Sequence, residues 1–317
     1  MAALVFFKPL FVFFGEIMEQ DCLIRGLHPL LNLRAVWAET TDLVNAGITT
    51  HDTDLAAAMA FANALSAAAV SAAMLDEGDR FSIRCEYPGT LRGMIIESAA
   101  DGAIRGVPFA PHPLDGGSCE LGELYGDNDG MIYVTRSTPD GKILNSGQTR
   151  APLADPANDL AFFFCVSNQI ETEIRTWAEY QADPQRPVKR MSVLMLQAMP
   201  DCDLEAFSNL RNAIHGAAAS EIRKNLDFFN EPEKAMKSML AELAHIANVP
   251  DFDAEKCVFT TGVKPRWQCR CSEESMRRAM TVLGKEDLAK LFEERTDPEI
   301  KCNFCCRSYR FKKEDFF

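Results

Sequence analysis

Four cysteines near the end of the chain carry the clearest potential chemistry in the sequence. They form two close pairs, Cys269-Arg-Cys271 and Cys302-Asn-Phe-Cys305. A gap of one or two residues lets both sulfurs of a pair reach one metal ion where the backbone turns, and two such pairs supply the four thiolates of a tetrahedral zinc site. The spacing therefore predicts that Cys269, Cys271, Cys302 and Cys305 together bind one Zn²⁺.

Two simpler explanations for these cysteines fit the sequence less well. Free cysteines are often buried as small apolar side chains, but five of the eleven cysteines lie between residues 269 and 306. A disulfide framework is the other explanation, and the odd total, the uneven spacing and the lack of a convincing secretory signal argue against it. These features favour a reducing compartment, and we predict a cytoplasmic protein.

Short regular elements are expected to hold the two pairs in place. Ser272 is a helix-capping residue, and the apolar side chains after it repeat with helical spacing until Gly284. A second short helix is predicted from Lys285 to the break at Asp297-Pro298, and residues 308–311 resemble a strand. The apolar positions of the two helices are Met276, Ala279, Met280 and Leu283 in the first and Leu288, Leu291 and Phe292 in the second.

The stability of this segment is expected to depend on the metal. A module of this size, residues 259–317, gains roughly 3–5 kcal/mol from its own apolar core. Structural zinc in finger peptides contributes an apparent value of roughly 10–16 kcal/mol. The module is therefore predicted to unfold when the ion is lost, and oxidation of the sulfurs would cause that loss.

The same segment closely resembles the redox-switch domain of the 33 kDa chaperonin (heat shock protein 33) family. The resemblance is carried by the run from Trp267 to Leu288, by Ile300-Lys-Cys-Asn-Phe-Cys305 and by Tyr309-Arg-Phe311. It implies an ATP-independent holdase that is inactive when reduced and zinc-bound, and active after oxidation with mild unfolding. It further implies disulfides Cys269–Cys271 and Cys302–Cys305 in the active state, unfolded or oxidatively damaged proteins as clients, and a homodimer as the active form.

The resemblance extends over about residues 20–317 and is weaker in the body of the chain. Residues 159–170 are similar to a family helix, with Asn168 where glutamate is usual, and residues 193–200 to a closing strand. Cys306 departs from the family pattern because it adds a thiol beside a predicted ligand. We interpret Cys306 as a bystander, with an alternate ligand or a resolving thiol as the other possible roles.

These observations divide the chain into four parts and predict an α+β fold. Residues 1–17 form an N-terminal extension or follow a mis-assigned start, and residues 18–200 form a mixed sheet-and-helix chaperone core. Residues 201–258 form a helical linker that is metastable in the family, and residues 259–317 form the zinc-binding redox-switch domain.

Hydrophobic patterns predict the main elements of these parts. In the core they indicate a half-buried strand from Leu33 to Thr41 and a buried helix over residues 55–75 that starts near Asp54. The family resemblance implies a further helix near residues 159–170. Further strands are expected at residues 80–86, 91–97, 103–107, 131–135 and 142–149, and the resemblance implies another at residues 193–200. In the linker, one apolar stripe contains Phe207, Leu210 and Ile214, and a second contains Met236, Met239, Leu240, Leu243 and Ile246.

Charge and hydropathy exclude two classes of partner. The net charge is −13, and residues 259–317 carry 13 Lys and Arg against 10 Asp and Glu. Phosphate binding needs a denser basic face, so we predict no nucleic-acid binding. Residues 55–75 lack charge over a length that could span a bilayer, but alanine dominates and a buried core helix is the better interpretation, so we predict no membrane association.

Catalysis is not expected. The sequence contains no phosphate-binding glycine loop, H-E-x-x-H or G-x-S-x-G motif. Two alternatives to the holdase remain open. A thiol-disulfide oxidoreductase would use the Cys302-x-x-Cys305 pair and would reduce insulin catalytically. A structural zinc module that binds a fixed partner would keep its zinc after treatment with peroxide and mild heat.

Overall fold

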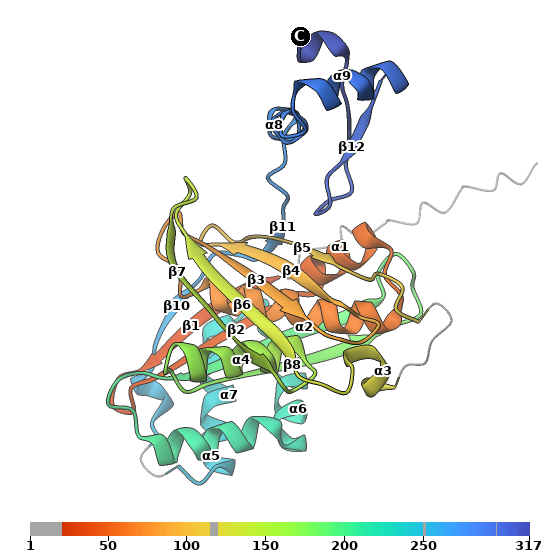
Figure 1. Cartoon of the computed structure of the whole chain (residues 1–317). Coiled ribbons are helices and arrows are strands. Elements are labelled where there is room, and N and C mark those ends of the chain that lie inside the picture. The colour runs from red at the N-terminus through yellow and green to blue at the C-terminus, as the bar shows by residue number, and fades with distance from the viewer. Residues whose placement is uncertain (1–20, 115–119, 250–251, 296) are drawn as a thin grey trace, which may run out of the picture.

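The computed structural model describes residues 21–114, 120–249, 252–295 and 297–317. The predicted N-terminal extension, residues 1–17, lies outside them. The described chain is an α+β fold, as predicted, in which two sheets enclose a central helix. Further helices cover the outside of one sheet, and a small module projects beyond the other (Figure 1).

Antiparallel pairing builds the first sheet. Its strand order is β10 (Val258–Thr261), β1 (Cys22–His28), β2 (Leu33–Glu39), β9 (Val188–Ala198) and β8 (Thr172–Tyr180). β2 is buried on both faces, not half-buried as predicted, because Val36 and Ala38 face the central helix whereas Ala35 and Trp37 face the outer helices.

The second sheet has the order β11 (Arg266–Trp267), β5 (Ala103–Pro108), β4 (Gly93–Ala99), β3 (Arg80–Glu86), β6 (Gly130–Ser137) and β7 (Ile143–Ala151). Its strands β3 to β7 confirm the predicted strands of this region. Only β11 is parallel to its neighbour among the described pairs, and its register places Arg266 opposite Ala103 and Trp267 opposite Ile104.

The predicted central helix is α2 (Leu55–Ala72), and it begins where expected because the Asp54 carboxylate accepts the N–H of Ala57. In the described part of the chain α2 is the single helix long and apolar enough to cross a bilayer, and 72% of that window is buried within the fold. Its alanines let both sheets approach closely. α2 packs there with α1 (Thr41–His51) and α4 (Pro156–Ser167), while α3 (Leu121–Tyr125) lies at the edge.

The strand prediction across Thr41 was wrong at its end, because α1 begins there. The first turn of α1 is capped by a residue distant in sequence, since Asp21 accepts the N–H groups of Asp42 at 2.9 Å and Leu43 at 2.8 Å. Sequence patterns detect only caps that lie within a few residues of the helix start. Asp21 lies just before β1, far from Thr41 in sequence, so the residues around Thr41 gave no indication of this cap.

Three helices of the predicted linker cover the outer face of the first sheet (Figure 1): α5 (Leu204–His215), α6 (Ala217–Lys224) and α7 (Pro232–Ile246). Their predicted apolar stripes are buried, except that Ile246 is largely exposed. Phe228, between α6 and α7, stacks on Trp37 with ring centroids 3.9 Å apart and an interplanar angle of 9°. An aromatic contact therefore fixes the linker on the sheet.

The small module contains α8 (Glu273–Thr281), α9 (Lys285–Glu294) and the hairpin of β12 (Glu299–Lys301) and β13 (Ser308–Arg310). These elements confirm the two short helices and the strand. Its core consists of Met280, Leu288, Phe292 and Phe311, whereas Ala279 and Leu283 of the predicted stripe are exposed. β10 and β11 fall within or next to the range predicted for this module, yet each pairs with a core sheet.

Candidate metal centre

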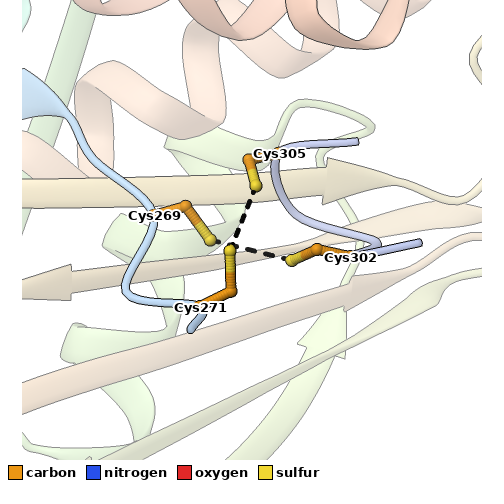
Figure 2. A group of neighbouring side chains, drawn as sticks. All are labelled: Cys269, Cys271, Cys302 and Cys305. Carbon is orange, nitrogen blue, oxygen red and sulfur yellow. Dashed lines mark hydrogen bonds between the residues drawn. The ribbon is translucent and has the colours of Figure 1, made fainter. Parts of the chain in front are cut away.

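The fold brings the sulfurs of Cys269, Cys271, Cys302 and Cys305 together, all within 4.8 Å of one another (Figure 2). Two contacts cross between the pairs, Cys269 Sγ to Cys302 Sγ at 3.7 Å and Cys271 Sγ to Cys305 Sγ at 3.4 Å. Zn–S bonds of about 2.3 Å at tetrahedral angles imply S···S separations of about 3.8 Å. Both the donor set and the spacing therefore fit a zinc ion held by four thiolates.

The first pair is anchored to the core. β11 pairs with β5, and the N–H of Gln268 donates to the carbonyl of Ile104 at 2.8 Å, immediately before Cys269. After Cys271 the chain enters α8, whose cap is Ser272 as predicted, since its hydroxyl accepts the N–H of Ser275. A sheet edge and a helix cap thus fix the backbone on both sides of this pair.

The second pair lies in the turn of the β12–β13 hairpin. The N–H of Cys302 donates to the carbonyl of Arg307, and the N–H of Cys306 donates to the carbonyl of Cys302, both at 2.9 Å. Cys306 has a φ of +58°, the left-handed region that is unusual for a residue with a side chain. This tight turn directs Cys302 and Cys305 to the same side, toward the first pair.

Two polar side chains approach the sulfurs. Arg105 of β5 donates from Nη1 to Cys269 Sγ at 3.5 Å, and the Tyr309 hydroxyl lies 3.1 Å from Cys271 Sγ. Burial alone would raise the pKa of the Cys269 thiol, but the hydrogen bonds from Arg105 and from the Cys271 backbone lower this pKa to about 7. Burial raises the pKa of Cys305 to about 12. Cys269 therefore ionises most readily of these two.

Arg105 was missed by the sequence analysis, since it lies 164 residues before Cys269 and in a different part of the fold. No local motif connects them. Tyr309 belongs to the Tyr-Arg-Phe segment that carried part of the resemblance, so its position was flagged although its contact with a sulfur was not foreseen.

Cysteines in the body of the chain have a different environment. Burial raises the pKa of Cys22 to about 12 and that of Cys257 to about 11, and it also raises the pKa of Cys202. Thiols with raised pKa values stay protonated at neutral pH and react slowly with oxidants. Within the four-sulfur group, in contrast, hydrogen bonds lower the pKa of the Cys269 thiol.

Cys306 lies beside this group but points elsewhere. Its sulfur is 3.8 Å from Nδ1 of His51 in α1 and is not a member of the four-sulfur group. We expect the Cys306→Ser variant to bind as much zinc per chain as the unmodified protein. Metal content of the purified, reduced variant measures this, and a loss of half the zinc or more would instead identify Cys306 as a ligand.

Comparisons with known proteins agree with this architecture. The sequence model of the family described as Hsp33 protein matches residues 21–312. The chain is 27% identical over 303 residues to a 33 kDa chaperonin from Clostridium perfringens strain SM101, covering 93% of this chain and 90% of the relative. It is 23% identical to a 33 kDa chaperonin from Clostridium botulinum strain Loch Maree, covering 93% and 96%.

A solved structure supports the fold. The crystal structure of a 33 kDa chaperonin (heat shock protein 33 homolog) from Thermotoga maritima has a TM-score of 0.74 against this chain, with 19% sequence identity. The match covers 93% of this chain and 96% of that one. The family model spans both sheets, the three outer helices and the four-cysteine module. The chain therefore belongs to the Hsp33 family of chaperones.

Proposed function

We propose that this protein is a redox-regulated, ATP-independent holdase whose four-cysteine site holds Zn²⁺ in the reduced, inactive state. The observation that carries the proposal is the four-sulfur group itself, because its geometry fits zinc and its ligands come from two separate segments. Bound zinc would supply the stabilisation that joins these segments, which the four buried side chains of the module core could not provide alone. Catalysis plays no part in this function.

The proposed trigger is oxidation of the four thiols to two disulfides. For each disulfide, two thiols give up two electrons and two protons to one molecule of hydrogen peroxide, which is reduced to two molecules of water. The family resemblance implies the pairs Cys269–Cys271 and Cys302–Cys305. The short contacts of the reduced protein instead join Cys269 with Cys302 and Cys271 with Cys305. All four sulfurs lie within 4.8 Å of one another, so the proposed pairs are also close enough to form after small movements of the side chains.

Loss of the module's structure is proposed to destabilise the linker through the strands that precede the site. The chain leaves α7, forms β10 at the edge of the first sheet, and then forms β11 at the edge of the second sheet before Cys269. Edge strands are held by one neighbour only. Loss of the module thus removes a constraint on β11 and β10, and through them on α7, which packs against β1.

The interface between the linker and the first sheet contains buried charged groups that would favour its opening. Arg223 of α6 is 2% exposed and pairs with Glu179 of β8 at 2.6 Å, while its Nη1 donates to the Ser192 hydroxyl at 3.3 Å. Ser192 in turn donates to the buried Glu39 carboxylate, whose pKa is raised by burial. Buried charges regain hydration when exposed, which offsets part of the cost of opening. Opening would uncover the apolar face around Trp37 and Leu196 for clients.

The clients are proposed to be unfolded or oxidatively damaged proteins, and the active form is proposed to be a cytoplasmic homodimer. An exposed apolar face of this kind binds without regard to sequence, which suits a holdase. It would also drive self-association once uncovered.

One paired measurement tests the function. Zinc release, followed with a colorimetric chelator, and aggregation of a thermally unfolding client are recorded together, before and after peroxide with mild warming and without nucleotide. We expect zinc release and suppression of aggregation to appear together. Retained zinc after oxidation, or insulin reduction without any effect on aggregation, would contradict the proposal and favour a structural zinc module or an oxidoreductase.

A further inference from the structure

Arg105 occupies a position between the core and both cysteine pairs. Its guanidinium is held from one side by Glu97 of β4, whose carboxylate accepts from Nε at 2.8 Å and from Nη2 at 2.6 Å. The remaining nitrogen, Nη1, donates to Cys269 Sγ at 3.5 Å. The same guanidinium lies over the ring of Phe304, 4.0 Å from its centroid. Phe304 lies between Cys302 and Cys305, so one side chain of the core contacts both halves of the site.

His51 at the end of α1 adds a second contact with the same turn. Its Nε2 lies 2.9 Å from the carbonyl oxygen of Gly106 and 3.1 Å from that of Phe304. Nε2 must carry the proton to donate to two carbonyls, which leaves Nδ1 unprotonated toward Cys306 in the neutral ring. The ring also packs edge-on against Trp267, two residues before Cys269.

The two cysteine pairs differ in how they reach the core. Cys269 follows β11, which is hydrogen-bonded to β5. Cys302 and Cys305 belong to the β12–β13 hairpin, whose strands pair only with each other among the described residues. The hairpin turn therefore meets the core through side-chain contacts, and Arg105 and His51 both meet it at Phe304.

We propose that Arg105 is a positioning residue of the metal site, which holds the Phe304 turn against the Cys269 sulfur, with His51 as its support, so that the folded core helps to retain the ion. The inference rests on the proposed zinc function and names the contact that links metal retention to docking of the module. By thermodynamic reciprocity, the bound ion strengthens docking by the same factor as docking strengthens binding of the ion. A cation beside a sulfur ligand favours its thiolate, and a planar guanidinium can stack on Phe304 while it binds Glu97.

The test uses the full-length, reduced, zinc-loaded chain without oxidant. The rate at which an excess of a colorimetric chelator removes zinc is compared among the unmodified protein, Arg105→Met and Arg105→Lys. Loss of a residue that orients a metal ligand typically weakens metal binding by 10- to 100-fold. We expect Arg105→Met to release zinc about 10-fold faster or more. The release rate of Arg105→Lys should lie between those of Arg105→Met and the unmodified protein, because lysine keeps the positive charge but lacks the planar guanidinium.

The matched control is Arg84→Met. Arg84 also pairs with a glutamate, Glu86, and lies over an aromatic ring, that of Phe109, on the same sheet but away from the sulfurs. It should release zinc at the unmodified rate. Limited proteolysis gives an independent readout, since cleavage between residues 272 and 317 should become faster in Arg105→Met and stay unchanged in Arg84→Met.

A second variant guards against a general folding defect. Phe304→Leu removes the ring from the other side of the contact, and its effect on the zinc release rate should be non-additive with that of Arg105→Met if the two side chains act through each other. Release within twofold of the unmodified rate in Arg105→Met, or full additivity with Phe304→Leu, would overturn the inference. If the unmodified chain bound no zinc, the proposed function itself would fail. If oxidation activated the unmodified chain but Arg105→Met released zinc at the unmodified rate, this inference alone would be refuted.

Discussion

The Phe228→Ala variant is expected to act as a holdase in the reduced state, without oxidant and with its zinc retained. Phe228 is fully buried between α6 and α7 and stacks on Trp37 at 3.9 Å. Truncation of a buried phenylalanine typically costs about 3–5 kcal/mol. The energy is lost at the contact between linker and sheet, on the side of the molecule opposite to α8, α9 and β12 (Figure 1).

The measurement is client aggregation in the presence of reductant, combined with zinc content and a thermal unfolding curve. The neighbouring Phe229→Ala variant is the matched control, because Phe229 is 38% exposed and its described aromatic contact is with Arg190 at 5.7 Å. It should stay inactive. If Phe228→Ala were less stable yet inactive while reduced, release of α5–α7 would not be the activating event.

The Cys302→Ser variant is expected to lose the metal and the folded structure of the module in the reduced state. A serine hydroxyl cannot replace a thiolate as a zinc ligand, and the binding energy at risk is an apparent value of roughly 10–16 kcal/mol. The module core of Met280, Leu288, Phe292 and Phe311 is too small to offset this loss. Zinc content, far-ultraviolet circular dichroism and protease cleavage after residue 268 measure the result.

The control for this variant is Cys306→Ser, which changes a neighbouring thiol that points away from the four-sulfur group. The core should remain folded in both variants, because its clusters share no side chain with that of the module. A Cys302→Ser protein that kept α8 and α9 and resisted protease without metal would show that the module is stable by packing alone. The proposed switch would then lack its driving force.

Local elements of this fold were predictable because their signals are local. Asp54 and Ser272 cap helices through side chains that bond the backbone three residues later, and both helix starts were predicted correctly. Alternation in β3, which confirms the strand predicted at residues 80–86, places Phe81, Ile83 and Cys85 on one buried face. In contrast, α1 depends on a cap from Asp21, which is distant in sequence, and Ile246, the last residue of α7, is exposed although it belongs to the predicted apolar stripe.

In the candidate site, too, some features depend on local sequence and others on contacts between distant residues. The sequence alone predicted which four cysteines lie together, because chelation by paired cysteines depends on short spacings that can be read along the chain. It also indicated the two helices between the pairs, because capping and apolar periodicity depend on neighbours within a few residues.

The tertiary structure alone decided what surrounds those ligands. Arg105 and His51 reach the cysteine turn from β5 and α1, and β10 and β11 join the sheets of the core although they adjoin the module in sequence. Such contacts depend on strand order and on packing between residues far apart in the chain. Local spacing therefore specifies which atoms can bind the metal, and the assembled fold specifies which parts of the protein respond when the metal is lost.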